Sequence, residues 1–175
     1  MDISIVSENS IKLKGKSIVF IVDPALALVK TNADAIILLN GVNGDNNIDK
    51  SRVVDSRIII NGPGEYEVGG TKVSGTSTPK GILYKLSIDE ISIILGKTEE
   101  IRTEGFNECQ VAVINTDGEF IESFVTGLEP KITVLYGGKK KEAAQALGAE
   151  NAVQLPKITI TKDKLPEKME IVVLG

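Results

Sequence analysis

The chain contains no histidine among its 175 residues. Histidine is the commonest protein ligand for metals such as zinc, and it is the usual general base near neutral pH. Its absence excludes Ser-His and Cys-His nucleophile pairs within the chain. Any metal-dependent hydrolysis by this chain would therefore have to rest on oxygen ligands.

Tryptophan is also absent, and aromatic residues make up only 4% of the chain. So few aromatic residues argue against a platform on which single-stranded nucleic acid could stack. The formal net charge of −4 gives no general attraction to nucleic acid or to an anionic membrane. We therefore predict no nucleic-acid partner and no membrane partner.

Cysteine occurs once, at Cys109, which excludes an internal disulfide and is typical of a reducing compartment. Without a histidine to activate it, this thiol is expected to be buried and unreactive. No apolar run approaches the ~20 residues that span a membrane, and residues 1–5 do not begin a signal peptide. These features predict a cytoplasmic protein, and the length predicts a single domain over residues 1–175.

The hydrophobic pattern predicts many short strands and few helices. Residues 11–14 alternate apolar and polar side chains, as a half-exposed strand does, whereas residues 17–22 form a continuous run typical of a strand covered on both faces. Helical patterns occur at 119–127 and 140–147, with a weaker one at 101–108. We expect two sheets packed together, with the helices outside them.

The stretch LLNGVNGDNNID, residues 38–49, follows a buried strand pattern at 35–39. A polar, glycine-broken loop after a core strand is a common location for ligands and catalytic groups. Residues 45–49 have the D-x-N-x-D spacing that begins a calcium loop, but Lys50 and Ser56 replace the glycine and glutamate that should follow. We interpret the loop mainly as turn-forming amides, with a pocket for a small ligand or an oxygen-liking cation as the alternative.

Three other polar patterns allow a functional and a structural interpretation. Asp23, within Val-Asp-Pro, could contact a ligand, but Asp-Pro also starts turns at strand ends. Glu65 and Glu67 lie on one face of a strand, where paired carboxylates could act in acid–base chemistry, yet a hairpin with Tyr66 turned to the core is favoured. Residues 137–141 could bind a phosphate at a helix start, although a solvated basic patch is favoured.

Several segments together resemble one family. They are VDP at 22–24, ADAIILL at 33–39, NGPGEYEVGGTKVSGT at 61–76, DEISIILGK at 89–97, LEPKITVLYG at 128–137 and ITKDKLPEKMEIVVL at 160–174. In this order they resemble the metallo-β-lactamase superfamily, in its branch of small Zn-dependent hydrolases. The resemblance covers nearly the whole chain and implies an α+β fold, a four-layer αββα sandwich that is rich in strands and has few helices.

The resemblance also indicates where metal ligands would lie. The family motif H-x-H-x-D-H places Asn40 and Val42 at the first two histidines, Gly44 at the aspartate and Asp45 at the third histidine. Lys97 ends the segment that should supply a further histidine and an aspartate. Gly137 replaces the last histidine. The candidate vestigial pocket therefore comprises Asp23, Asn40, Val42, Gly44, Asp45, Lys97 and Gly137.

Altered ligand positions on a retained scaffold predict a catalytically inactive, metal-free homologue that acts as a binding or interaction module and needs no cofactor. Lys97 would bring a positive charge into the space of the metals and could hold the loop together instead. The alternative is a divergent hydrolase that binds Mg²⁺, Mn²⁺ or Ca²⁺ through Asp23, Asp45 and Asp49. A homo-oligomeric scaffold is a third hypothesis. The sequence does not identify the protein or small-molecule partner.

Overall fold

The computed structural model describes residues 1–41, 47–98, 104–106 and 108–175. Most strands belong to two large sheets. The six-stranded sheet contains, in spatial order, β15 (Lys157–Thr159), β1 (Asp2–Ser7), β2 (Ser10–Lys14), β3 (Val19–Val22), β5 (Ala35–Ile37) and β7 (Ile58–Ile60). The eight-stranded sheet contains β14 (Gln154–Leu155), β16 (Glu170–Leu174), β13 (Ile132–Tyr136), β12 (Val111–Asn115), β11 (Ile91–Gly96), β10 (Gly81–Ile88), β9 (Thr71–Thr78) and β8 (Gly64–Val68). A small third sheet pairs β4 (Thr31–Asn32) with β6 (Val53–Val54).

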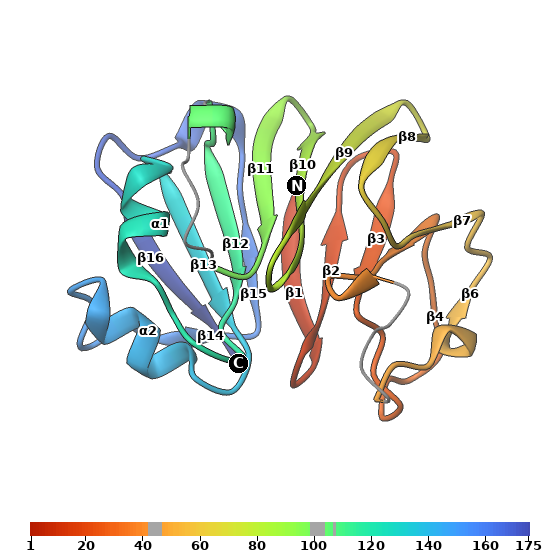
Figure 1. Ribbon diagram of the computed structural model, residues 1–175, viewed down its shortest axis with the longest axis horizontal. Helices are drawn as coiled ribbons and strands as arrows, with labels where there is room; N and C mark the ends of the chain where they lie inside the picture. The colour runs from red at the N-terminus through yellow and green to blue at the C-terminus, as the bar shows by residue number, and fades with distance from the viewer. Residues whose placement is uncertain (42–46, 99–103, 107) are drawn as a thin grey trace.

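The two large sheets pack face to face around the main apolar core (Figure 1). Helices α1 (Glu122–Gly127) and α2 (Lys140–Ala146) cover the outer face of the eight-stranded sheet, where Phe124 and Ala143 join a second apolar cluster. The small sheet lies on the opposite side of the molecule, and a third cluster, which includes Leu28 and Val53, fills the space beneath it. This arrangement confirms the predicted α+β sandwich with many strands and few helices.

Strand β3 covers Val19–Val22, two residues shorter than the strand expected at 17–22, and it shows why a continuous apolar run forms a buried strand. Alternate side chains of a strand point to opposite faces of its sheet. Phe20 and Val22 enter the core between the large sheets, whereas Ile21 belongs to the cluster on the outer face. Both faces of this strand are covered, so alternation with polar residues is not needed, as the sequence predicted.

The outer layer over the six-stranded sheet differs from the helical layer on the other side. Among the described residues it consists of short strands, turns and 3₁₀ turns, including one at Lys50–Arg52. Helix α1 begins at Glu122, three residues later than expected, because Ile121 has an extended backbone (φ −113°, ψ 101°); its N–H donates to the Thr98 hydroxyl. The weak helical pattern at 101–108 gives a 3₁₀ turn at Glu104–Phe106, and its other residues lie partly outside the described part of the chain. No helix in the described ranges is long and apolar enough to cross a membrane.

Parallel pairing places several strand ends at one end of the sandwich. Strands β3 and β5 run parallel in one sheet, and β11, β12 and β13 run parallel in the other. The carboxyl ends of parallel strands lie at the same edge of a sheet. Residues that follow these strands, far apart in the sequence, therefore meet at that end.

Candidate functional site

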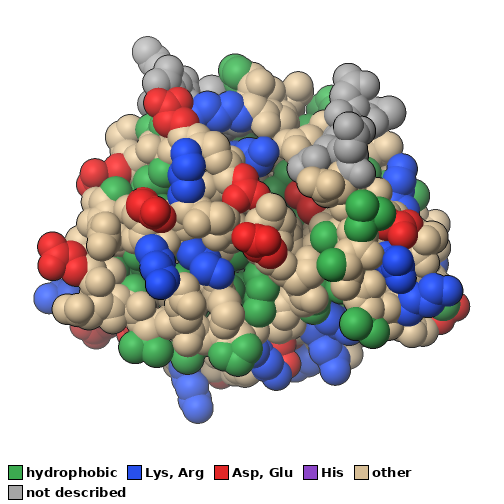
Figure 2. All heavy atoms as spheres, turned by 90° about the horizontal axis from the view of Figure 1, so that it is seen from below, with side chains coloured by type: hydrophobic (Ala, Val, Ile, Leu, Met, Phe, Trp, Pro, Cys, Tyr) green, Lys and Arg blue, Asp and Glu red, His purple; other side chains and the backbone are tan. Residues whose placement is uncertain are grey.

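A pocket of about 340 Å³ opens at this end of the sandwich. Such a volume lies within the range of small-molecule sites. The six-stranded sheet and its loops contribute Ser7, Glu8, Asn9, Asp23, Ala25, Leu26, Ala27, Asn40, Asn47 and Ile48, and the eight-stranded sheet contributes Lys97, Asn115 and Asp117. Figure 2 looks onto this end of the molecule, where acidic side chains gather near the middle and basic side chains lie around them.

Asp23 connects the ends of two neighbouring strands. It follows β3 with a positive φ of 44°, and its carboxylate Oδ1 accepts a hydrogen bond of 3.0 Å from the backbone N–H of Leu39, beyond β5. Its carbonyl oxygen accepts a hydrogen bond from the Ser10 hydroxyl. The aspartate therefore has the turn role that its Asp-Pro context predicts, and it also lines the pocket.

Lys97 connects the two sheets across the pocket. Its ammonium Nζ donates to Oδ1 of Asn40 at 3.1 Å, so the residue after β11 contacts the third residue after β5. The next residue, Thr98, is buried, and its hydroxyl accepts from the Ile121 N–H at 2.9 Å and donates to the Glu119 carbonyl at 3.2 Å. These contacts fix the segment that carries Lys97.

Asn115 and Asp117 are pocket residues that the sequence analysis missed. Oδ1 of Asn115 accepts from the Asp117 N–H at 2.9 Å, and Oδ1 of Asp117 accepts from the Gly138 N–H at 2.7 Å. Gly137 does not line the pocket but lies against this loop, because a Cβ there would come within 3.0 Å of Asp117 Oδ1. The sequence contained a signal for these two residues. The polar stretch 115–118 comes at the end of a buried strand, and the loop after β5 follows a buried strand in the same way.

The hydrogen bond between Gly138 and Asp117 also decides between the two interpretations of the basic segment at the start of α2. The backbone N–H of Gly138 is already bound by the chain's own Asp117 carboxylate. Lys139 and Lys141 are exposed, which is the solvated patch that the sequence favoured. With seven residues, α2 is also too short to build a strong dipole.

Two buried tyrosines lie beneath the pocket. Tyr84 donates from its hydroxyl to the Leu38 carbonyl at 3.0 Å, and the Tyr136 hydroxyl is buried without a hydrogen-bond partner among the described residues. Burial raises the pKa of Tyr136 well above its usual range, with a smaller contribution from the Asp23 carboxylate. Burial likewise raises the pKa of Tyr84. Both side chains are therefore neutral phenols that cannot serve as bases near neutral pH.

The charges in the pocket are unbalanced. Three carboxylates, those of Glu8, Asp23 and Asp117, share it with one ammonium, that of Lys97. Among the ion pairs formed by described residues, none includes Lys97, Glu8 or Asp117. The pocket thus presents one cation, Lys97, and two carboxylates, Glu8 and Asp117, that form no ion pair within the described part of the chain.

The remaining candidates lie elsewhere. Asp49 caps the 3₁₀ turn at 50–52, where its carboxylate binds the Ser51 N–H at 3.0 Å and Arg52 Nε at 3.0 Å, and it does not line the pocket. Val42, Gly44 and Asp45 lie outside the described residues.

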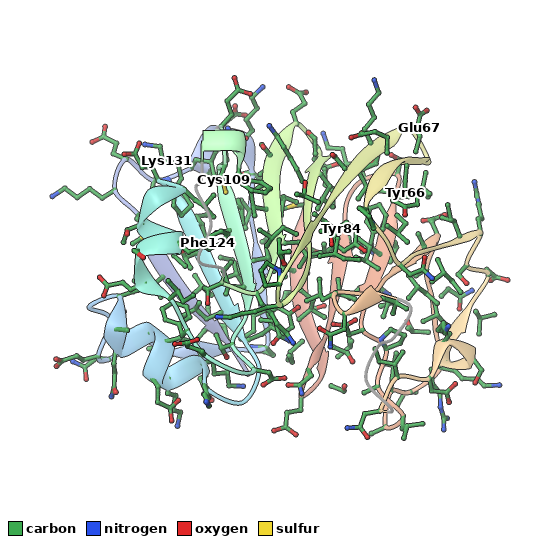
Figure 3. The ribbon with its side chains drawn as sticks, viewed as in Figure 1. Tyr66, Glu67, Tyr84, Cys109, Phe124 and Lys131 are labelled. Atoms are coloured by element: carbon green, nitrogen blue, oxygen red, sulfur yellow. The ribbon has the colours of Figure 1, made fainter. Side chains whose placement is uncertain are left out.

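The hairpin carboxylates are not near the pocket. Glu65 and Glu67 are exposed on the edge strand β8, and Figure 3 shows Glu67 at the far end of the sandwich from the turn between β1 and β2. Tyr66 packs against the core and donates to the Gly62 carbonyl at 3.1 Å, as the hairpin interpretation predicted. Cys109 is buried, which raises the pKa of its thiol to about 12 and confirms the expected inert cysteine.

Comparison with solved structures identifies the fold. A protein from Thermotoga maritima, described as a Zn-dependent hydrolase of the metallo-β-lactamase superfamily, matches with a TM-score of 0.74 and 18% identity over 99% of this chain and 97% of its own. An isothiocyanate hydrolase from Delia radicum gut bacteria matches at TM-score 0.61, with 11% identity over 92% and 100% of the two chains. The metallo-β-lactamase fold protein YhfI from Bacillus subtilis matches at 0.59, with 7% identity over 98% and 95%. No family model and no curated protein sequence matches the chain.

This chain therefore has the metallo-β-lactamase fold, as the resemblance implied. The residues of its pocket do not fit the zinc site that the resemblance implies for this fold. A zinc site requires three or four donors from histidine, cysteine or carboxylate side chains at about 2.0–2.3 Å. Within the described ranges, no group of three or more such side chains is placed to hold a metal ion. The Lys97 ammonium instead lies beside Asn40, where it would repel a dication.

Proposed function

We propose that this chain is a metal-free binding protein, whose pocket includes Asn40 and Lys97, at positions that the family resemblance assigns to metal ligands. The observation that supports the proposal is the hydrogen bond between Lys97 and Asn40. A protonated lysine occupies the place that the family resemblance assigns to a metal-binding carboxylate. Its hydrogen bond joins the two sheets without a metal ion.

The composition of the pocket supports the same function. Asn40, Asn47 and Asn115 supply amides, which orient ligands through hydrogen bonds but are weak metal ligands and poor general bases. A nucleophile needs an adjacent base to activate it, and the chain has no histidine for that role. The volume of the pocket suits a small-molecule ligand. The alternative binding partner is a protein that inserts one side chain into the same pocket.

The test is elemental analysis of protein purified without chelators and without a histidine tag, because such a tag would add the ligands that the chain lacks. The melting temperature is then followed during titration with Zn²⁺, Mn²⁺, Mg²⁺ and Ca²⁺. We expect no stoichiometric metal and no change in melting temperature.

Stoichiometric metal with a clear thermal shift would overturn the proposal, provided that Asp23→Asn or Asp45→Ala abolished the shift. That result would favour the divergent hydrolase with oxygen ligands. Asp23→Asn is an informative variant because an amide oxygen can still accept the hydrogen bond from the Leu39 N–H. A loss of metal binding would then not be caused by loss of the turn.

A further inference from the structure

The charged groups of the pocket occupy different ends of it. The hydrogen bond between Lys97 and Asn40 places the ammonium where β11 faces β5. Glu8 belongs to the turn between β1 and β2, which is separated from β5 by β3 in the six-stranded sheet. Asp117 follows β12, the neighbour of β11 on the side toward β13. The cation therefore lies toward one end of the pocket and these two carboxylates toward the other.

The strand order gives the scale of this separation. Neighbouring strands lie ~4.8 Å apart, so Asp117, one strand from Lys97, and Glu8, two to three strands from β5, lie on the order of 5–14 Å from the cationic end. Lys97 donates one of its three N–H groups to Asn40, which leaves two for a ligand. At the other end, Asn9 lines the pocket beside Glu8, and its side-chain amide adds a polar group to this end.

Part of the pocket lining is apolar. It consists of Ala25, Leu26, Ala27 and Ile48, and an isolated bridge pairs Ala25 with Ile48. Leu26 remains 52% exposed, although burial of a leucine side chain is favourable. A ligand with an uncharged middle section would cover it.

We propose that the pocket binds a small zwitterion of the size of a dipeptide or an ω-amino acid, an inference that rests on the proposed metal-free binding function. The ligand's carboxylate binds Lys97 and the amide of Asn40. Its ammonium group binds the end formed by Glu8, Asn9 and Asp117, and its uncharged section contacts Leu26. Such a ligand gives Lys97 an anionic partner and gives Glu8 and Asp117 a shared cationic partner, whereas a simple anion or a simple cation supplies only one of these contacts.

Isothermal titration calorimetry tests this with glycyl-leucine and 6-aminohexanoate. Two capped peptides are matched controls: acetyl-glycyl-leucine lacks the cation, and glycyl-leucinamide lacks the anion. Free leucine, whose charges are closer together, controls for the separation. We expect both zwitterions to bind, each capped peptide to bind at least tenfold more weakly than glycyl-leucine, and free leucine to bind more weakly as well.

Variants connect binding to the proposed residues. Lys97→Met and Asp117→Asn should each weaken binding of glycyl-leucine at least tenfold. Asn at 117 can still accept from the Gly138 N–H, so this variant preserves the loop. Lys141→Met and Asp163→Asn, which change exposed charges outside the pocket, should have no effect. Circular dichroism and thermal melting establish that each variant is folded.

Two results would overturn the ligand class: neither zwitterion binds the folded protein, or a capped peptide binds as tightly as glycyl-leucine. Insensitivity of binding to both pocket variants would overturn the site. Each titration is repeated with EDTA and with added Zn²⁺. Binding that requires Zn²⁺ would overturn the proposed metal-free function while supporting the ligand class, so the two failures are distinguishable.

Discussion

The ammonium of Lys97 donates a hydrogen bond of 3.1 Å to the side-chain oxygen of Asn40, 57 residues away in the sequence. This contact connects the loop after β5 to the end of β11 and so ties the two sheets at the pocket. Hydrogen bonds to charged groups contribute roughly 1.5–3 kcal/mol, and exposure to solvent reduces this contribution.

Lys97→Met should lower the free energy of unfolding by about 1 kcal/mol, since the side chain is only partly buried. Asn40→Ala should have a similar cost, and the double variant should cost less than the two single changes together. Chemical denaturation of all four proteins gives the coupling energy. Lys80→Met is a matched control, because the ion pair of Lys80 with Glu119 is exposed and should contribute little. Equal costs for Lys97→Met and Lys80→Met would contradict a special role for the Lys97 contact.

Tyr84 and Tyr136 provide a matched pair of buried phenols. Tyr84→Phe removes a hydrogen bond to the Leu38 carbonyl and should cost about 1–2 kcal/mol of stability. The Tyr136 hydroxyl is buried beside the Asn115 side chain but makes no hydrogen bond of good geometry with a described residue, so Tyr136→Phe should cost less than Tyr84→Phe, at most about 1 kcal/mol. Thermal or urea unfolding measures both variants. A loss at Tyr136 as large as that at Tyr84 would show that its hydroxyl is hydrogen-bonded in solution.

Gly81 allows the backbone of β10 to approach the end of β5. Its φ is +147°, a Cβ there would lie 2.5 Å from the Leu39 carbonyl oxygen, and Ile82 donates to that oxygen at 2.8 Å. Gly81→Ala should therefore destabilise the protein by about 3 kcal/mol and disturb the neighbouring Asn40. Gly148→Ala, with φ of +81° but no atom within 4 Å of the added Cβ, should cost only about 1 kcal/mol. Equal costs measured by denaturant unfolding would mean that close approach is not the reason for glycine at position 81.

Asp2 should make stability depend on pH in acid. Hydrogen bonds from Lys157 and Thr159 lower the pKa of Asp2 below its usual value of 3.8. A carboxyl whose pKa is lower in the folded state stabilises the protein above its unfolded pKa, and this contribution is lost as pH falls through the folded pKa. Stability should therefore decrease as pH falls below about 4, because protonated Asp2 loses its contacts with Lys157 and Thr159 of β15, the neighbour of β1. Asp2→Asn should reduce the pH dependence in this window, and an unchanged profile would assign it to other carboxylates.

Most of the fold could be predicted from the sequence. The alternation of apolar and polar side chains along a strand can be read from neighbouring residues. Residues 11–14 alternate because one face of their strand is covered, whereas residues 17–22 do not alternate because both faces of β3 are covered. The start of α1 could not be predicted, because the Ile121 N–H bonds to the hydroxyl of Thr98, 23 residues earlier. Such a contact leaves no local signal.

The sequence by itself determined the chemistry that the pocket lacks, since a chain without histidine cannot place one at any site. It also marked Asp23, Asn40 and Lys97, which the structure brings to one pocket. Only the tertiary structure decided that Glu8 and Asp117 join them. Acidic and amide residues occupy turns throughout proteins for backbone reasons alone, so their sequence context does not separate a pocket residue from any other turn residue. The packing of the two sheets, which brings the ends of β3, β5, β11 and β12 together, makes that distinction.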